Sequence, residues 1–129
     1  MRLSIAFILV AVSVLGGPRP VVAHHSITGE FDPSKPVTLK GQVTKIEWTN
    51  PHARIYIDVA QPNGTIVNWN IELAAVSALA RNGWTRSALK IGDTVTVDGI
   101  HARSGAPIAN ARSVVLPDGR KVLSGAADQ

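Results

Sequence analysis

The residues of this chain with the clearest chemical potential are its four histidines, two of them adjacent: His24, His25, His52 and His101. The adjacent pair directly follows Val21-Val22-Ala23, a stretch typical of a signal-peptide cleavage site. A cut after Ala23 would give His24 a free α-amine, whose reference pKa is near 8, beside its own imidazole. An amine and two imidazole nitrogens around one ion form a histidine brace, and nitrogen-rich tetragonal sites suit Cu(II). The four histidines are therefore candidate copper ligands.

The position of the cut selects the coordination mode. A cut after Val22 would place a histidine third in the chain and create a different copper-chelating terminus. His25 offers a competing mode through the amine, its own backbone nitrogen and its imidazole. The alternative without a metal also stays open, because two histidines in an N-terminal arm are commonly just solvated and His101 can simply pack at a strand end.

Residues 1–23 are expected to form a secretory signal peptide. Arg2 supplies a positive charge, and the thirteen residues 3–15 that follow are uncharged. This run is shorter than the roughly 20 apolar residues of a membrane-spanning helix. The protein is accordingly expected to be exported, to the periplasm or the medium. An uncleaved signal that anchors the chain is the alternative, and membrane contact is expected only by that route.

Composition excludes several classes of function. The chain has no cysteine, which excludes disulfides, thiolate metal sites and a lipoprotein anchor. Removing residues 1–23 takes two of the 13 basic residues, so 13 − 2 = 11 remain against 9 acidic ones and the net charge falls from +4 to about +2. These basic residues are scattered, so nucleic acid is not an expected partner. GxSxG, HExxH and Walker signatures are absent, and no enzyme activity is expected.

The pattern of apolar residues predicts an all-β domain with one short helix. Residues 24–36, which hold two prolines and a glycine, are expected to be a flexible N-terminal arm. A change of alternation phase near Thr44 and Lys45 indicates a bulge in the first strand. Strands are predicted at 37–49, 52–60, 65–73, 94–102 and 108–116, a helix at 74–83, a short last strand at 121–123 and a tail at 125–129.

This order of elements is that of a small OB-like five-stranded barrel over residues 37–124. Another small barrel or sandwich with an inserted helix is the alternative. In an OB-like barrel, the loop before His52 and the loop after His101 border one rim, so these two histidines are expected to converge there. The arm can span up to roughly 40 Å when extended, which is enough to bring His24 to the same rim.

A second candidate site is the outward face of the second and third strands. Alternation places polar residues from both strands there, and these form the candidate ligand face: Arg54, Tyr56, Asn68, Asn70 and Glu72. Amides, a guanidinium, a carboxylate and one aromatic ring could hold a small polar ligand or a protein partner. An ordinary solvated sheet face is the alternative. The three tryptophans, Trp48, Trp69 and Trp84, are expected in the core.

Several motifs of the chain together resemble a family of small exported bacterial proteins, the domain-of-unknown-function family 6152. They are Ala23-His24-His25-Ser26, Trp48-Thr49-Asn50-Pro51-His52, Trp69-Asn70-Ile71-Glu72, Gly83-Trp84, the stretch 89–99 and Ala111-Arg112-Ser113-Val114. The chain departs from the resemblance at Ile27, where such proteins carry an aromatic residue. The resemblance implies export and carries over no catalytic residue.

The sequence thus predicts a non-enzymatic exported binding protein. Its ligand is expected to be a transition metal, Cu(II), or else a polar molecule or protein bound without metal on the strand face.

Overall fold

The computed structural model describes residues 27–124, which form a sheet with two short helices. The elements are α1 (Ile27–Glu30), β1 (Phe31–Glu47), β2 (Arg54–Ala60), β3 (Ile66–Glu72), α2 (Val76–Arg81), β4 (Thr94–Ala102), β5 (Ile108–Val115) and β6 (Lys121–Leu123). The expected signal peptide, His24, His25 and the tail 125–129 lie outside these residues. Within residues 27–124, no helix is long and apolar enough to cross a membrane.

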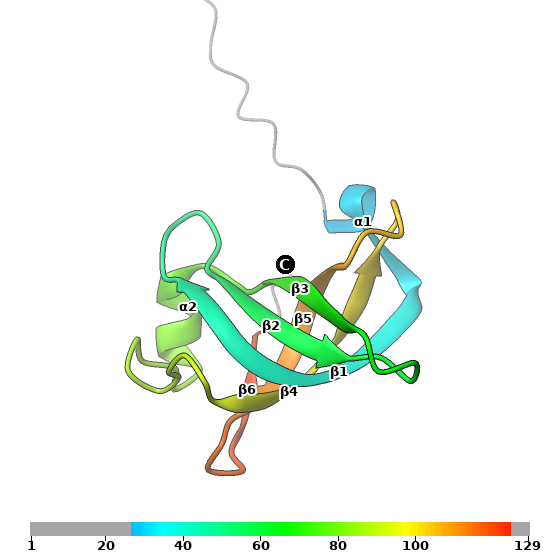
Figure 1. The fold of residues 1–129 in the computed structure, drawn as a ribbon. Helices are drawn as coiled ribbons and strands as arrows, with labels where there is room; N and C mark the ends of the chain where they lie inside the picture. Colours follow the sequence, from blue (N-terminus) through cyan, green and yellow to red (C-terminus); the bar gives the residue numbers. More distant parts are fainter. Residues whose placement is uncertain (1–26, 125–129) are drawn as a thin grey trace, which may run out of the picture.

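The six strands form one sheet in the order β3-β2-β1-β4-β5-β6, as Figure 1 shows. All neighbours in this order are antiparallel. One further pairing is parallel and joins β3 to β5, through Asn70↔Ile108, Ile71↔Ala109 and Glu72↔Asn110. The predicted β-rich fold with a helix between the third and fourth strands is confirmed. The parallel pairing brings β2, β3, β5 and β4 into one continuous row of neighbours.

The longest strand, β1, serves both halves of the sheet, because its first half pairs with β4 and its second half with β2. The predicted bulge is confirmed, since the β1–β2 register shifts between Val43 and Lys45. Gly41 lies where β1 passes close to β2: a Cβ atom there would be 2.4 Å from the carbonyl oxygen of Asp58. The absence of a side chain at this position therefore permits the close approach.

The start of the ordered fold differs from the prediction. β1 begins at Phe31 rather than at residue 37, and the four residues before it form α1, so residues 27–36 are not a separate arm. The reason is a small second core that the sequence reading missed. Phe31 is fully buried there with Ile100 and Ala102, and Ile27 and Ile108 pack against it. Burial of this aromatic ring outweighs the prolines that suggested a loop.

The main core fills the inner face of the sheet. Strict alternation along β2 buries Ile55, Ile57 and Val59, while the residues between them are partly exposed. Leu79 of α2 and Trp84 are also fully buried in this core, and Trp48 and Trp69 pack against it partly exposed. Gly64 and Gly83, in the turns that follow β2 and α2, both have positive φ, which glycine adopts readily. Alternation along the strands thus separates an inner face from an outer face, and it sets the direction of the strand side chains at the candidate sites.

Candidate functional site

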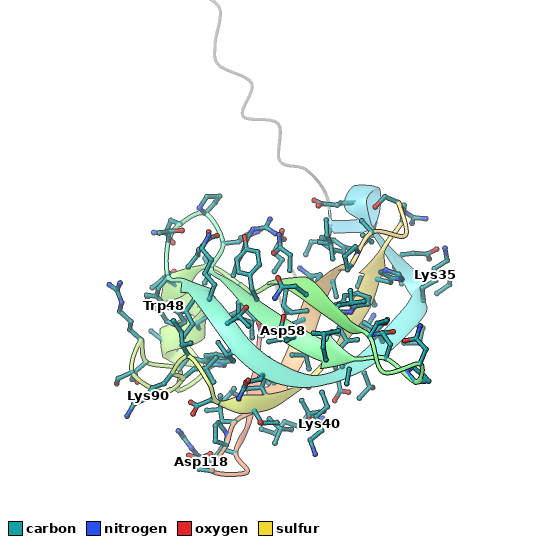
Figure 2. The ribbon with its side chains drawn as sticks, viewed as in Figure 1. Lys35, Lys40, Trp48, Asp58, Lys90 and Asp118 are labelled. Carbon is teal, nitrogen blue, oxygen red and sulfur yellow. The ribbon has the colours of Figure 1, made fainter. Side chains whose placement is uncertain are left out.

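The five residues predicted to share an outward face do lie together on β2 and β3. The register pairs Arg54 with Glu72, Tyr56 with Asn70 and Asp58 with Asn68. Their neighbours along β2 point into the core, so this row points away from it. Asp58, labelled in Figure 2, lies near the middle of the view on this face. The prediction from alternation is confirmed for the geometry of the face.

At one end of this face lies the carboxylate of Glu72, which is buried. Its side chain is 6% exposed, and its Oε2 accepts a hydrogen bond from Arg54 Nη2 at 2.6 Å. Its Oε1 lies 2.9 Å from His52 Nδ1 and 3.4 Å from Asn110 Nδ2. Arg54 also donates from Nη1 to Asn70 Oδ1 at 3.1 Å. The buried charge is therefore paired and hydrogen-bonded, as a buried carboxylate requires.

Two members of this cluster were absent from the predicted ligand face. Asn110 is 4% exposed and lies on β5, opposite Glu72 in the parallel pairing. His52 was predicted as a metal ligand on a rim, not as the partner of Glu72. A signal for Asn110 did exist in the sequence, because it is an amide within the largely apolar stretch Ile108–Val115.

The contact with Glu72 selects the tautomer of the neutral His52 ring. An ionised carboxylate can only accept hydrogen bonds, so Nδ1 of His52 is the donor. In the neutral ring, the lone pair then lies on Nε2. The side chain of His52 is 38% exposed, against 29% for Arg54. His52 thus combines a fixed orientation with a second ring nitrogen that is able to bind a ligand.

A second polar cluster continues along the same face toward β1. Lys45 Nζ lies 2.6 Å from Glu47 Oε1 and 5.0 Å from the centre of the Tyr56 ring. The Tyr56 hydroxyl donates to Glu47 Oε2 at 3.3 Å. The hydrogen bond from Lys45, together with its charge and the Tyr56 hydroxyl, holds the pKa of Glu47 below its usual range. In return, Glu47 raises the pKa of Lys45.

The far end of the face is held by Asn68. Its Nδ2 donates to Asp58 Oδ1 at 2.8 Å and to Thr44 Oγ1 at 3.0 Å. Thr44 in turn donates to the carbonyl oxygen of Tyr56 at 3.3 Å. The side chains of the predicted ligand face therefore bond to one another and to neighbouring side chains of the sheet, and these bonds set their orientations.

His101 does not join His52, which corrects the predicted convergence. His101 pairs across the strands with Ala109, which is fully buried on the inner face. Its ring lies 5.0 Å from that of Trp69, and its Nε2 is 2.8 Å from the carbonyl oxygen of Ala106, to which it donates. The alternation Val95, Val97, Gly99 already directs residue 101 inward. His52 faces outward and His101 inward, so the two rings cannot share one ion across the sheet.

Among residues 27–124, no group of three or more histidine, cysteine or acidic side chains is arranged to hold a metal ion. His24 and His25, the other predicted ligands, lie outside the described residues. A metal site at His52 would therefore need ligands from beyond this part of the chain.

Comparison with known proteins places the chain in a family without assigning it an activity. No curated protein matches the sequence significantly. One family model matches residues 11–110, which is most of the chain and includes His52, Arg54, Glu72 and Asn110. The chain therefore belongs to this family, which is described as a family of unknown function, DUF6152.

Proposed function

We propose that this protein is a non-enzymatic exported binding protein for a transition metal ion, Cu(II). The observation that carries the proposal is the 2.9 Å contact between His52 Nδ1 and the buried carboxylate of Glu72. Histidines that bind metals almost always donate their other ring N–H to a carboxylate, a carbonyl or water, which fixes the tautomer and the ring. His52 has this support and leaves its Nε2 for the metal.

The remaining ligands in this proposal come from the mature N-terminus. Export with cleavage after Ala23 would make His24 the first residue, so that its amine and its imidazole chelate the ion. His25 can replace one of these nitrogens in the competing mode described above. His101 no longer belongs to the proposed ligand set, because it faces the core and its Nε2 donates to Ala106.

We further infer that the sheet is an OB-like barrel. The parallel β3–β5 pairing supports this, because β3 and β5 are otherwise separated by three strands in the sheet order. The order of three strands, a helix and two more strands is also that of the OB-fold. In such barrels the loops at the ends of the strands commonly border the binding site, which agrees with the place of His52 just before β2.

Copper titration of the mature protein tests the proposal. Protein that starts at His24 is titrated with Cu(II) in a competing chelator and compared with two variants, His52→Ala and His101→Gln. Loss of His52 is expected to weaken binding by more than about 100-fold, beyond the 10–100-fold typical of losing an outer partner of a ligand. The His101 variant is expected to bind like the native protein. Equal binding by the native protein and His52→Ala, or no binding by either, would reject the proposal.

A second function is favoured by the continuity of the polar face itself. Arg54, Tyr56, Asn68 and Asn70 present a guanidinium, a phenol ring and two amides in fixed positions, which suits a polar ligand or protein partner bound without metal. Arg54→Gln distinguishes the two functions in pull-downs from the exported fraction, made with copper removed. A partner that binds the native protein but not this variant supports the second function over the first.

A further inference from the structure

We infer that residues 27–31 form a strap that stabilises the parallel pairing of β3 with β5, and that this strap thereby keeps Asn110 beside Glu72. The strap consists of α1 and Phe31, and Arg103 from the loop after β4 fastens it to the sheet. The inference goes beyond the proposed function, because it uses only described residues and requires no metal ion.

The parallel pairing is short. It consists of three register pairs: Asn70↔Ile108, Ile71↔Ala109 and Glu72↔Asn110. The antiparallel pairing of β3 with β2 runs over all seven residues of β3. Parallel pairing is also slightly less stable per residue than antiparallel pairing. The pairing of β3 with β5 therefore depends strongly on the side chains that pack beside it.

The strap supplies apolar side chains where the parallel pairing begins. Ile108, the first residue of β5, packs on the small core of Phe31, Ile100 and Ala102, and Ile27 packs on the same core. Phe31 is 1% exposed and pairs with Ala102 across β1 and β4. This core lies on the outer face of the sheet, because the neighbouring residue of β5, Ala109, belongs to the main core inside. The strap thus covers the start of β5 from outside.

Arg103 fastens the strap at two successive points. Its backbone N–H donates to the carbonyl oxygen of Glu30, and its Nε donates to that of Thr28, both at 2.9 Å. Its Nη1 also lies 3.8 Å from Oδ2 of Asp32, directly after the strap. Figure 1 shows α1 beside the loop between β4 and β5, where Arg103 lies. The strap is therefore attached through polar bonds as well as through the small core.

The pairing that the strap stabilises carries one contact of the candidate site. Nδ2 of Asn110 lies 3.4 Å from Oε1 of Glu72, and these two residues form the last of the three register pairs. Asn110 is also the register partner of Ile100, which belongs to the small core. An opening of this short pairing would separate Glu72 from Asn110. The strap accordingly controls how often the buried carboxylate loses its partner on β5.

Native-state hydrogen exchange of two backbone amides tests the strap. The N–H of Asn70 donates to the carbonyl oxygen of Pro107 at 3.0 Å and reports on the parallel pairing. The N–H of Val43, in the second half of β1, donates to the carbonyl oxygen of Asp93 at 2.8 Å and reports on the rest of the sheet. Exchange at both amides is measured in the purified protein and in four variants.

Two of the variants loosen the strap, and each has a matched control. Ile27→Ala removes an apolar contact of the small core, and Ile91→Ala is its control, because the side chain of Ile91 is 70% exposed. Arg103→Ala removes the side-chain bond to Thr28. Arg120→Ala is its control, because that side chain is similarly exposed (57% against 49%) and bonds locally to Asp118.

Ile27→Ala is expected to speed exchange at Asn70 at least about tenfold, because loss of a packed isoleucine side chain raises the population in which the pairing is open. Arg103→Ala should speed it by a smaller factor of at least about twofold, since Phe31 remains buried. Exchange at Val43 should stay native in both variants, and both controls should match the native protein at both amides. Native exchange at Asn70 in Ile27→Ala overturns the inference. Equal acceleration at Asn70 and Val43 also overturns it, because the whole sheet would then open together.

Discussion

At the scale of single residues, Glu72 is the group on which the proposed site depends. One carboxylate oxygen orients His52 and the other holds Arg54, so that the imidazole and the guanidinium share one buried charge. Arg54 pairs with the second oxygen of Glu72, so the buried carboxylate is hydrogen-bonded through both of its oxygens.

The variant Glu72→Gln is expected to weaken Cu(II) binding of the mature protein by about 10–100-fold, because His52 loses its carboxylate partner. It should also lower the free energy of unfolding by about 1–3 kcal/mol, since Arg54 loses a charge-assisted bond. Chelator competition and urea unfolding measure the two effects. Glu47→Gln is the control on the same face and should leave copper affinity unchanged. Native copper affinity in Glu72→Gln would contradict the orienting role.

Glu47 gives a pH prediction whose sign follows from its lowered pKa. Because the folded-state pKa lies below the unfolded value of about 4.3, the unfolded chain binds more protons between these two values. The contribution of Glu47 to stability is therefore present above about pH 4.3 and is lost as the pH falls through the folded-state pKa. In urea unfolding from pH 7 to 3, Glu47→Gln should lose less stability than the native protein. Equal losses would contradict the Lys45–Glu47 interaction.

The residue scale also shows where sequence reasoning reached its limit. Alternation correctly placed Arg54, Tyr56, Asn68 and Asn70 on one face, because direction in a strand depends only on parity. Burial of Glu72 could not be read the same way, since it depends on Asn110 from a strand 38 residues further along the chain. Alternation along β4 does indicate that His101 points inward, but the prediction that it converges with His52 on one rim did not take this into account.

At the scale of elements, the sheet depends on two close approaches between strands. A Cβ atom on Gly99 would lie 2.2 Å from the carbonyl oxygen of Asn110, at a point where the β4–β5 register shifts. Gly41 makes the corresponding approach between β1 and β2, at 2.4 Å. Both contacts are with backbone, which cannot move aside as a flexible side chain can. The absence of a side chain at Gly41 and at Gly99 therefore permits both approaches.

Gly99→Ala is accordingly expected to destabilise the fold by about 1–3 kcal/mol, the usual range for overpacking. Its added methyl group also pushes on Asn110, so copper affinity should fall as well. Urea unfolding and chelator competition check both. Thr94→Ala, at an exposed position of the same strand, should change stability by less than about 0.5 kcal/mol. A Gly99→Ala protein as stable as the native one would show that β4 and β5 can separate at this point.

The start of β1 was predicted less accurately from the sequence than the other strands. Pro33 and Pro36 suggested a loop, but proline is tolerated at irregular positions, and the β1–β4 register shifts between Phe31 and Pro36. The single buried ring of Phe31 extends the strand past both of them. An isolated aromatic residue before two prolines gives no periodic signal. Its burial depends on Ile100 and Ala102, which are distant in the sequence and become its neighbours only in the folded structure.

At the scale of the whole molecule, the proposed function describes a protein that is completed by its own processing. The sheet supplies one oriented imidazole, and the proposed cut after Ala23 would create the amine that completes the chelate. The β-rich order of elements and the outward face could be predicted from the sequence, but the burial of Phe31 could not, because it depends on Ile100 and Ala102 from β4.

The most direct test of this account changes only the N-terminus. Cu(II) affinity of protein that starts at His24 is compared with protein carrying Gly-Ser-Gly ahead of it; one or two added residues would place a histidine third and create a new chelating terminus. The account predicts that the extension weakens binding by more than about 100-fold, because the amine is no longer adjacent to the His24 imidazole, while the thermal stability of the copper-free protein is unchanged. Equal Cu(II) affinity of the two proteins would contradict it.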